Sequence, residues 1–282
     1  MLVDGEGRSR HGETARVRWS IGSYGRASWH EIQWMRTTDY ITNENFVAEG
    51  IHSMADSALQ RHAARDIPRL QPGDHLTRDQ FERRYEAMPD VKKAELIEGV
   101  VYMPSPVATE SHGSPHAMLI TWLGVYFGNT AGVQVADNAT IRLDWDNEPQ
   151  PDAFLRILPE CGGQTRDDGP YVAGGPEWAG EVAASSASYD MHEKKEAYRR
   201  NGVCEYVVWR VEDEALDWFV LVRGEYRQLD AGEEGILRSE VFPGLWLDCD
   251  ALLARNMQRV LDVLDRGLRS AQHADFVKRL GR

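Results

Sequence analysis

The stretch that decides the fold spans residues 149–209, from PQPDAFLRIL at 149–158 through EVAA at 181–184 to EYVVW at 205–209. Asp152 opens the first of these apolar runs, and Glu181 opens the second. Short apolar runs bounded by turn residues predict buried strands. Lys194 follows on a segment with helical character. The stretch therefore predicts two carboxylates at the starts of neighbouring strands, with an ammonium group on the next helix.

Two carboxylates so placed can hold a hard divalent cation, because Mg²⁺ prefers oxygen ligands and keeps several waters. An ammonium group beside them can orient or deprotonate a water and neutralise charge on a phosphate. Simpler interpretations stay open for each residue. Asp152 is equally well explained as a strand-capping aspartate. Asp190 lies four residues before Lys194, so a plain ion pair on the helix surface is the alternative there.

The motifs around this stretch follow one another in a specific order. They are Glu95-Leu96-Ile97-Glu98-Gly99, Met103-Pro104-Ser105-Pro106, His116 ahead of an apolar helix, Pro151-Asp152, Glu181-Val182, Asp190 with Lys194 and Tyr198, and Gly202-Val203-Cys204-Glu205-Tyr206. Their order and spacing over residues 67–260 resemble the PD-(D/E)XK nuclease superfamily and, within it, the Uma-type restriction endonucleases. The resemblance implies a mixed α/β (α+β) fold with a restriction-endonuclease-like core, in which helices flank a central mixed sheet.

The resemblance also implies a site. Asp152 and Glu181 would bind one Mg²⁺ or Mn²⁺ together with the backbone carbonyl of Val182. Lys194 would position or activate the attacking water. Glu95 would orient the site or bind a second ion, and an outward-facing strand glutamate is the alternative for this residue.

The sequence departs from the simplest superfamily pattern, because Ala183 stands two residues after Glu181, where the usual lysine would be. In the resembling family that lysine has moved to the following helix, which Lys194 fits. Tyr198 shares a helix face with Lys194 at i, i+4 and would support it. Lys195 should point about 100° away.

His112 and His116 are also spaced i, i+4, but Pro115 lies between them. Proline favours the first helical position, so the pattern predicts that His112 precedes the helix and that His116 starts it. A zinc site is disfavoured. His116 is expected to hydrogen-bond locally or to approach a phosphate, in support of the site.

The elements outside the central stretch are read from periodicity and turn residues. The patterns predict a helix at 77–88 with a Thr77–Gln80 capping box, a hairpin at 94–103 turning at Glu98-Gly99, and a buried helix at 116–127. Strands are predicted at 133–136, 139–144, 205–211 and 216–222. One C-terminal helix at about 250–281 is predicted to dock on the core or on a partner, a homodimer being one alternative.

The resulting domain organisation has three parts. Residues 1–66 form an N-terminal extension of unclear structure, residues 67–260 the restriction-endonuclease-like domain, and residues 261–282 the C-terminal helix. The extension contains no lysine but includes Trp19, Trp29 and Trp34, and pure disorder is usually poor in aromatic residues. Translation that starts at Met35 or Met54 is the alternative interpretation of this stretch.

Composition limits the class of protein. The 282 residues are 42% hydrophobic and include three widely spaced cysteines, which are expected to be reduced thiols. A signal peptide and an apolar run long enough to span a membrane are both absent from the sequence, so a cytoplasmic location and no membrane partner are expected. The net charge of −13 opposes general affinity for nucleic acid. A bound metal ion and a local basic patch, at Arg199-Arg200 or Arg210, would have to overcome it.

These observations favour a metal-dependent endonuclease that cleaves DNA. The acidic charge and the missing strand lysine motivate an alternative from another class, a non-catalytic nucleic-acid-binding or interaction module on the same fold. A metal-dependent hydrolase of some other phosphodiester is the third hypothesis. The sequence contains no Walker loop, dinucleotide-binding glycine motif or H-E-x-x-H motif, which disfavours P-loop and zincin chemistry.

Overall fold

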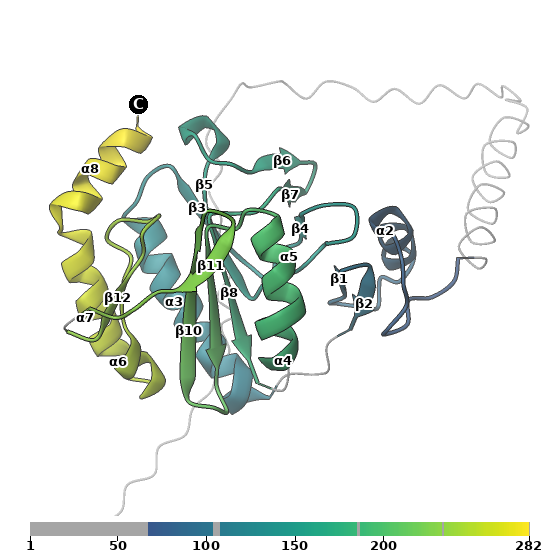
Figure 1. Cartoon of the computed structure of the whole chain (residues 1–282), viewed down its shortest axis with the longest axis horizontal. Helices are drawn as coiled ribbons and strands as arrows, with labels where there is room; N and C mark the ends of the chain where they lie inside the picture. Colours follow the sequence, from purple (N-terminus) through teal and green to yellow (C-terminus); the bar gives the residue numbers. More distant parts are fainter. Residues whose placement is uncertain (1–66, 104–107, 185–186, 233, 282) are drawn as a thin grey trace, which may run out of the picture. The chain divides into compact units, whose positions relative to one another are not determined.

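The Asp152 and Glu181 runs form adjacent strands of a six-stranded sheet in the computed structural model (Figure 1). The strand order is β11-β10-β9-β8-β5-β3. The pair β8–β9 is parallel, whereas the other neighbours in this sheet are antiparallel. The predicted central mixed sheet is therefore confirmed. The structure describes residues 67–103, 108–184, 187–232 and 234–281, so the predicted extension at 1–66 lies outside the described residues.

The sheet strands are β3 (Val133–Asp137), β5 (Ala153–Ile157), β8 (Trp178–Ala183), β9 (Glu205–Arg210), β10 (Ala215–Val222) and β11 (Glu225–Gln228). The smaller strands are β1 (Glu95–Ile97), β2 (Val100–Tyr102), β4 (Ile141–Arg142), β6 (Arg166–Asp168), β7 (Tyr171–Ala173), β12 (Ile236–Arg238) and β13 (Trp246–Asp248). The helical elements are α2 (Arg78–Glu86), η1 (Thr109–Gly113), α3 (Ser114–Gly128), η2 (Pro159–Cys161), α4 (Ala187–Tyr189), η3 (Asp190–Lys194), α5 (Lys195–Arg200), α6 (Cys249–Leu253), α7 (Met257–Leu268) and α8 (Ala271–Leu280).

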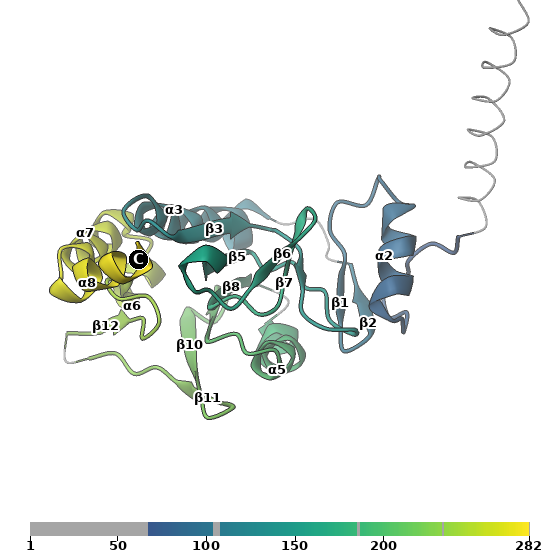
Figure 2. The same ribbon diagram turned by 90° about the horizontal axis from the view of Figure 1, so that it is seen from above.

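Helices cover both faces of the sheet, as the resemblance implies, and Figure 2 shows α3 and α5 on opposite sides of it. The α3 face holds the larger apolar cluster. In it, the Trp122 ring of α3 makes edge-to-face contacts with the rings of Trp178 and Trp218, which lie on the sheet. The α5 face holds a smaller cluster that includes Tyr198 and Tyr206. Side chains alternate between the two faces along each strand, so the central strands β8, β9 and β10 contribute to both clusters.

A third apolar cluster lies beneath α2 and the β1–β2 hairpin and includes Phe81, Met88 and Leu96. The predicted α2 capping box forms, with the Thr77 N–H donating to Gln80 Oε1 at 3.1 Å. The predicted hairpin turn forms too, with positive φ at both Glu98 and Gly99. Reciprocal backbone hydrogen bonds then join Leu96 to Glu148. They bring the start of β1 close to the segment that leads into Asp152.

The C-terminal region differs from the single helix predicted at about 250–281. It forms α6, α7 and α8, because Asn256 and Ser270 each accept a hydrogen bond from a backbone N–H three residues later and start new helices. Val260 of α7 and Phe276 of α8 belong to the cluster that packs against α3. The predicted docking on the core is thus observed. None of the helices in the described part of the chain is both long and apolar enough to cross a membrane.

Two carboxyl groups, the buried Glu148 and the half-buried Glu82, lie close together between the segment before Asp152 and α2. Glu148 is buried, and its Oε2 atom has no hydrogen-bond partner among the described residues. Burial, followed by the neighbouring Glu82 carboxyl, raises the pKa of Glu148 to about 8. Between its ordinary pKa and pH 8 the folded state therefore holds a proton that the unfolded state releases. Stability contributed by this group consequently falls as pH rises through that interval.

We expect Glu148→Gln to flatten this dependence, because glutamine imitates the protonated acid at every pH. Urea unfolding should give similar stabilities for the variant and the wild type near about pH 5, and a more stable variant at about pH 8.5. A variant that stays less stable than the wild type at the higher pH would show that an ionised Glu148 is tolerated.

Candidate active site

Asp152 and Glu181 lie opposite each other where β5 and β8 separate. The ladder between these strands ends at the Ala153–Gly180 pair. Beyond it each carboxylate contacts the backbone of the other strand. The Val182 N–H donates to Asp152 Oδ2 at 2.8 Å, and the Asp152 N–H donates to Glu181 Oε2 at 3.4 Å. Both side chains are buried. The structure thus brings the two predicted carboxylates together.

The prediction that Glu181 begins its strand is wrong in detail. The strand β8 starts at Trp178, and Glu181 is its fourth residue. Trp178 and Ala179 are fully buried on opposite faces of the sheet, which extends the strand on its N-terminal side. Glu181 is opposite Asp152 because β5 is antiparallel to β8 and begins one residue after Asp152.

Lys194 points inward from a π-helical turn, η3, which joins α4 to α5. Its ammonium lies 3.0 Å from Glu95 Oε1, 3.0 Å from Glu181 Oε1 and 3.6 Å from Asp190 Oδ1. The lysine is 2% exposed. The Asp190–Lys194 pair predicted as the simpler alternative is therefore present, but it is buried and shared with two further carboxylates. Single π turns are frequent at functional sites.

Glu95 and Tyr198 complete this inner part of the site. Glu95 is buried rather than facing outward, and its Oε1 accepts the Gln150 N–H at 2.6 Å. The Tyr198 hydroxyl donates to Glu181 Oε1 at 3.2 Å. Tyr198 was predicted to support Lys194. The Tyr198 hydroxyl bonds to Glu181 instead, at the same Oε1 atom that the Lys194 ammonium contacts.

Two histidines bind Asp152 from the α3 side. The His112 Nε2–H donates to Asp152 Oδ2 at 3.1 Å. The His116 Nε2–H donates to the Asp152 backbone carbonyl at 2.9 Å and lies 3.1 Å from Asp137 Oδ1. His116 was the histidine expected to support the site, yet His112 is the one on the carboxylate. Pro115 does not separate them, because a second π turn, η1, runs directly into α3 and keeps the two rings 5.6 Å apart.

Lys93 is a member of the site that the sequence did not indicate. Its Nζ lies 3.3 Å from Asp152 Oδ1 and donates to Asn138 Oδ1 at 3.0 Å. It lies two residues before Glu95, outside any of the motifs. An alternating basic and acidic pair at the start of β1 was the available signal, but surface strands carry such pairs routinely.

The two carboxylates titrate differently. Burial opposes ionisation of Asp152, but the His112 hydrogen bond, the Lys93 charge and the Val182 N–H together hold its pKa well below the usual range. For Glu181, burial raises the pKa to about 8. The Lys194 charge lowers it, and the charges of Asp152, Asp190 and Glu95 raise it further. The pKa of Asp152 is thus lowered by its partners, whereas that of Glu181 is raised by burial.

Both lysines are held in the charged form. Burial lowers the pKa of Lys194, but Glu181, Glu95 and Asp190 outweigh burial and raise it well above the ordinary value. Burial also lowers the pKa of Lys93, but the negative charges of Glu95 and Asp152 outweigh burial and raise it. Lys194 is therefore a fixed positive charge that donates hydrogen bonds, rather than a base.

The donors present fit a hard divalent cation. Glu95, Asp152, Glu181 and Asp190 are four carboxyl groups, whereas Lys93 and Lys194 are two ammonium groups, which leaves an excess of two acidic side chains. Among the described residues, no three His, Cys, Asp or Glu side chains are arranged to enclose a metal. A cation would therefore use Asp152, Glu181, a backbone carbonyl and water, which suits Mg²⁺ or Mn²⁺.

The Val182 carbonyl is the predicted third ligand. The N–H and C=O of one strand residue point to the same edge of the strand, since paired residues in a ladder exchange both bonds. The Val182 N–H points at Asp152, so its carbonyl points towards the same side. This orientation agrees with the predicted role.

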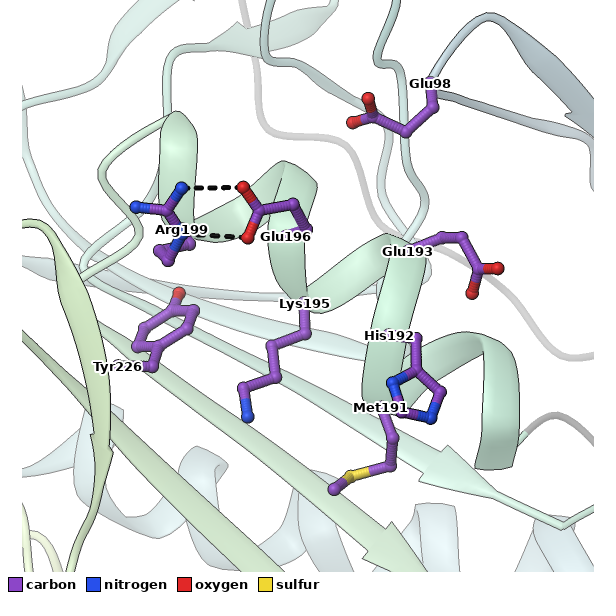
Figure 3. Close-up of a pocket in the computed structure, with 8 residues that line it drawn as sticks. All are labelled: Glu98, Met191, His192, Glu193, Lys195, Glu196, Arg199 and Tyr226. Carbon is purple, nitrogen blue, oxygen red and sulfur yellow. Dashed lines mark hydrogen bonds and ion pairs between the residues drawn. The ribbon is translucent and has the colours of Figure 1, made fainter.

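The next lysine along, Lys195, lies outside this site. It lines an open pocket on the outer side of the η3–α5 segment together with His192, Arg199 and Tyr226 (Figure 3). Its Nζ lies 3.4 Å from the centre of the Phe219 ring. Lys194 and Lys195 therefore face different environments, as the helical rotation between neighbouring residues predicts.

Comparisons with known proteins relate the chain to nucleases. The family model described as "Putative restriction endonuclease", Uma2, matches residues 78–250. A solved structure from Anabaena variabilis ATCC 29413, described as a putative nuclease belonging to DUF820, is 14% identical, with a TM-score of 0.46. The match covers 63% of this chain and 99% of that chain. The curated proteins contain no match in sequence.

The family match contains Glu95, Asp152, Glu181 and Lys194, the residues that the structure gathers in one buried cluster. It extends over more than half of the chain. This protein belongs to the Uma2 family of restriction-endonuclease-like proteins.

Proposed function

We propose that this protein is a divalent-metal-dependent endonuclease that hydrolyses phosphodiester bonds in DNA. The observation that carries the proposal is the buried cluster of Asp152, Glu181 and Lys194 at the point where β5 and β8 separate. Oxygen donors and a fixed ammonium group occur there together, in a chain whose family model is described as "Putative restriction endonuclease".

Asp152, Glu181 and the Val182 carbonyl would hold Mg²⁺ or Mn²⁺. The bound ion would supply Lewis-acid polarisation of the scissile phosphate and a more acidic bound water. Glu181 must lose its proton to serve as a ligand, so metal binding should strengthen as pH rises towards 8. Tyr198 and Lys194 fix the orientation of the Glu181 carboxylate through its Oε1 atom.

Lys194 would stabilise charge rather than remove a proton. Its raised pKa supports the orienting role over deprotonation of water. Glu95 holds Lys194 through both carboxylate oxygens, at 3.0 and 3.2 Å. Glu95 would therefore position the lysine, which supports the orienting role predicted for it over that of a ligand for a second ion.

The substrate must approach an acidic protein. The arginines expected to form a basic patch are already paired: Arg199 with Glu196, Arg200 with Glu98, and Arg210 with Asp213 and Asp217. Lys93 is also paired, with Asp152, but it lies at the site itself, and Lys92 next to it is exposed. We propose that these two lysines, with His112, receive the phosphate backbone.

The test is a cleavage assay with labelled duplex and single-stranded DNA at about pH 8.5, where Glu181 is mostly ionised. We expect cleavage with Mg²⁺ or Mn²⁺ and none after chelation. Turnover of bis-p-nitrophenyl phosphate without DNA cleavage would select a hydrolase of another phosphodiester. Absence of both activities, with no saturable Mn²⁺ binding in the presence or absence of DNA, would select the non-catalytic module.

We expect His112→Ala to weaken Mn²⁺ binding by about 10-fold or more, because a residue that hydrogen-bonds to a metal ligand typically contributes 10–100-fold to metal affinity. His116→Ala is the comparison and should change affinity much less, since His116 contacts the Asp152 backbone carbonyl and the exposed Asp137. Calorimetric titration measures both. A larger loss of Mn²⁺ affinity in His116→Ala than in His112→Ala would show that His116 supports the site, as the sequence predicted.

A further inference from the structure

A second cavity lies beside Asp152, on the strand that Asp152 precedes. It has a volume of about 330 Å³ and lies between strands β3 and β5 and the β6–β7 hairpin. Its lining includes Gln134, Ala136, Phe154, Arg156, Asp167 and Tyr171. This volume is at the lower end of the range for small-molecule sites, which start near 300 Å³.

Two residues of β5 that line the cavity, Phe154 and Arg156, lie on the same face of the sheet as Asp152. Ala136 pairs with Phe154 and Gln134 pairs with Arg156 across the β3–β5 ladder. Alternate residues of a strand share a face, so Asp152, Phe154 and Arg156 point to the same side of the sheet. At about 3.4 Å per residue, Phe154 and Arg156 lie roughly 7 and 14 Å along the strand from Asp152.

The cavity combines an apolar floor with a hydrogen-bonding wall. Arg156 is 5% exposed and donates to Gln134 Oε1 at 2.7 Å and to Asp167 Oδ1 at 2.8 Å. The side chain of Asp167 is 71% exposed, so a ligand can reach its carboxylate from solvent. Tyr171 lines the cavity, and the Arg142 guanidinium lies over its ring, 4.4 Å from the ring centre.

We propose that this cavity binds one nucleobase of the DNA strand, turned out of its stack beside the bond to be cut. The inference rests on the proposed function and specifies its substrate. Extruded bases are held by hydrogen bonds to their edges and by stacking on aromatic or apolar side chains. The exposed Asp167 carboxylate supplies an acceptor, and the Tyr171 ring supplies an aromatic contact. The Asp167 carboxylate disfavours a phosphate as the occupant.

The first experiment titrates the four uncharged deoxynucleosides into the metal-free protein and follows binding by saturation-transfer NMR. We expect at least one deoxynucleoside to bind and Tyr171→Ala to weaken it about 10-fold, within the range for loss of one aromatic–base contact. Trp145→Ala is the matched control. Trp145 is 69% exposed and also lies against an arginine, Arg78, but it is outside the cavity. It should leave affinity unchanged.

A second variant, Ala139→Phe, keeps the test decisive if Tyr171→Ala does not fold. Ala139→Phe should fill the cavity from its rim and weaken deoxynucleoside binding to a similar extent. The inference is overturned if no deoxynucleoside binds, or if both variants bind like the wild type. Because the titration uses neither metal nor cleavage, its outcome is independent of the nuclease assay. Deoxynucleoside binding without nuclease activity would support the base-binding cavity and reject the proposed nuclease function.

Discussion

Asp152→Asn is expected to lower metal-dependent DNA cleavage by about a thousand-fold or more, which corresponds to the several kcal/mol that a catalytic metal contributes. Asparagine keeps the shape of the side chain and an oxygen that can accept the Val182 N–H. It removes the carboxylate of the pair whose pKa is lowered, whereas the pKa of Glu181 is raised. Loss of the metal, rather than loss of the fold, is therefore the expected cause.

Asp137→Asn is the matched control for this variant. Asp137 is also near the site, where it contacts His116, but its side chain is 56% exposed. Surface substitutions usually change stability by less than about 0.5 kcal/mol, so cleavage should stay within about two-fold of the wild type. Single-turnover cleavage and Mn²⁺ calorimetry should be measured on all three proteins. Wild-type cleavage by Asp152→Asn would reject Asp152 as a metal ligand.

The main elements of the fold could be predicted because they depend on local patterns. The apolar runs at Asp152 and Glu181 became adjacent strands, and the Thr77 capping box and the Glu98-Gly99 turn formed where the sequence indicated. Each of these features is encoded within a few residues. The order of the motifs then carried the family resemblance, which the Uma2 match confirms.

The parts of the site that were missed depend on distant contacts. Lys93 and His112 reach Asp152 across 59 and 40 residues of sequence. A periodic pattern cannot show that a lysine before β1 and a histidine before α3 meet at one carboxylate. The π turn η1 adds a local reason, because Pro115 indicated a helix start that would exclude His112. The β6–β7 hairpin was missed for a related reason, since its glycine-rich and acidic sequence resembles a loop.

Lys194→Met is expected to lower the free energy of unfolding by about 3–5 kcal/mol, the usual cost of removing one partner from a buried ion pair. The change leaves Glu95, Glu181 and Asp190 without the ammonium group that they share. The melting temperature should fall by roughly 10 °C, since each kcal/mol shifts it by 2–4 °C in a domain of 150–250 residues. Differential scanning calorimetry measures this change, and DNA cleavage should be lost with it.

Lys195→Met is the matched control, because it removes the same charge from the adjacent residue. Lys195 faces the open pocket of Figure 3 and interacts with the Phe219 ring. Its loss should cost no more than about 1 kcal/mol, the value of an exposed cation–π contact. Equal destabilisation by the two variants would mean that burial of the Lys194 charge has no special role.

The pH dependence separates lost charge pairing from lost packing. Without Lys194, the neighbouring carboxyl groups should keep their protons to higher pH in the folded state than they do in the wild type. The folded variant then binds more protons than the folded wild type, so the stability difference between them should grow as pH rises and shrink as pH falls. A loss of stability that is constant between about pH 5 and pH 8.5 would reflect packing of the lysine stem instead.

Added Mn²⁺ provides a further check, since a cation held at Asp152 and Glu181 would replace the missing positive charge. It should stabilise Lys194→Met more than it stabilises the wild type.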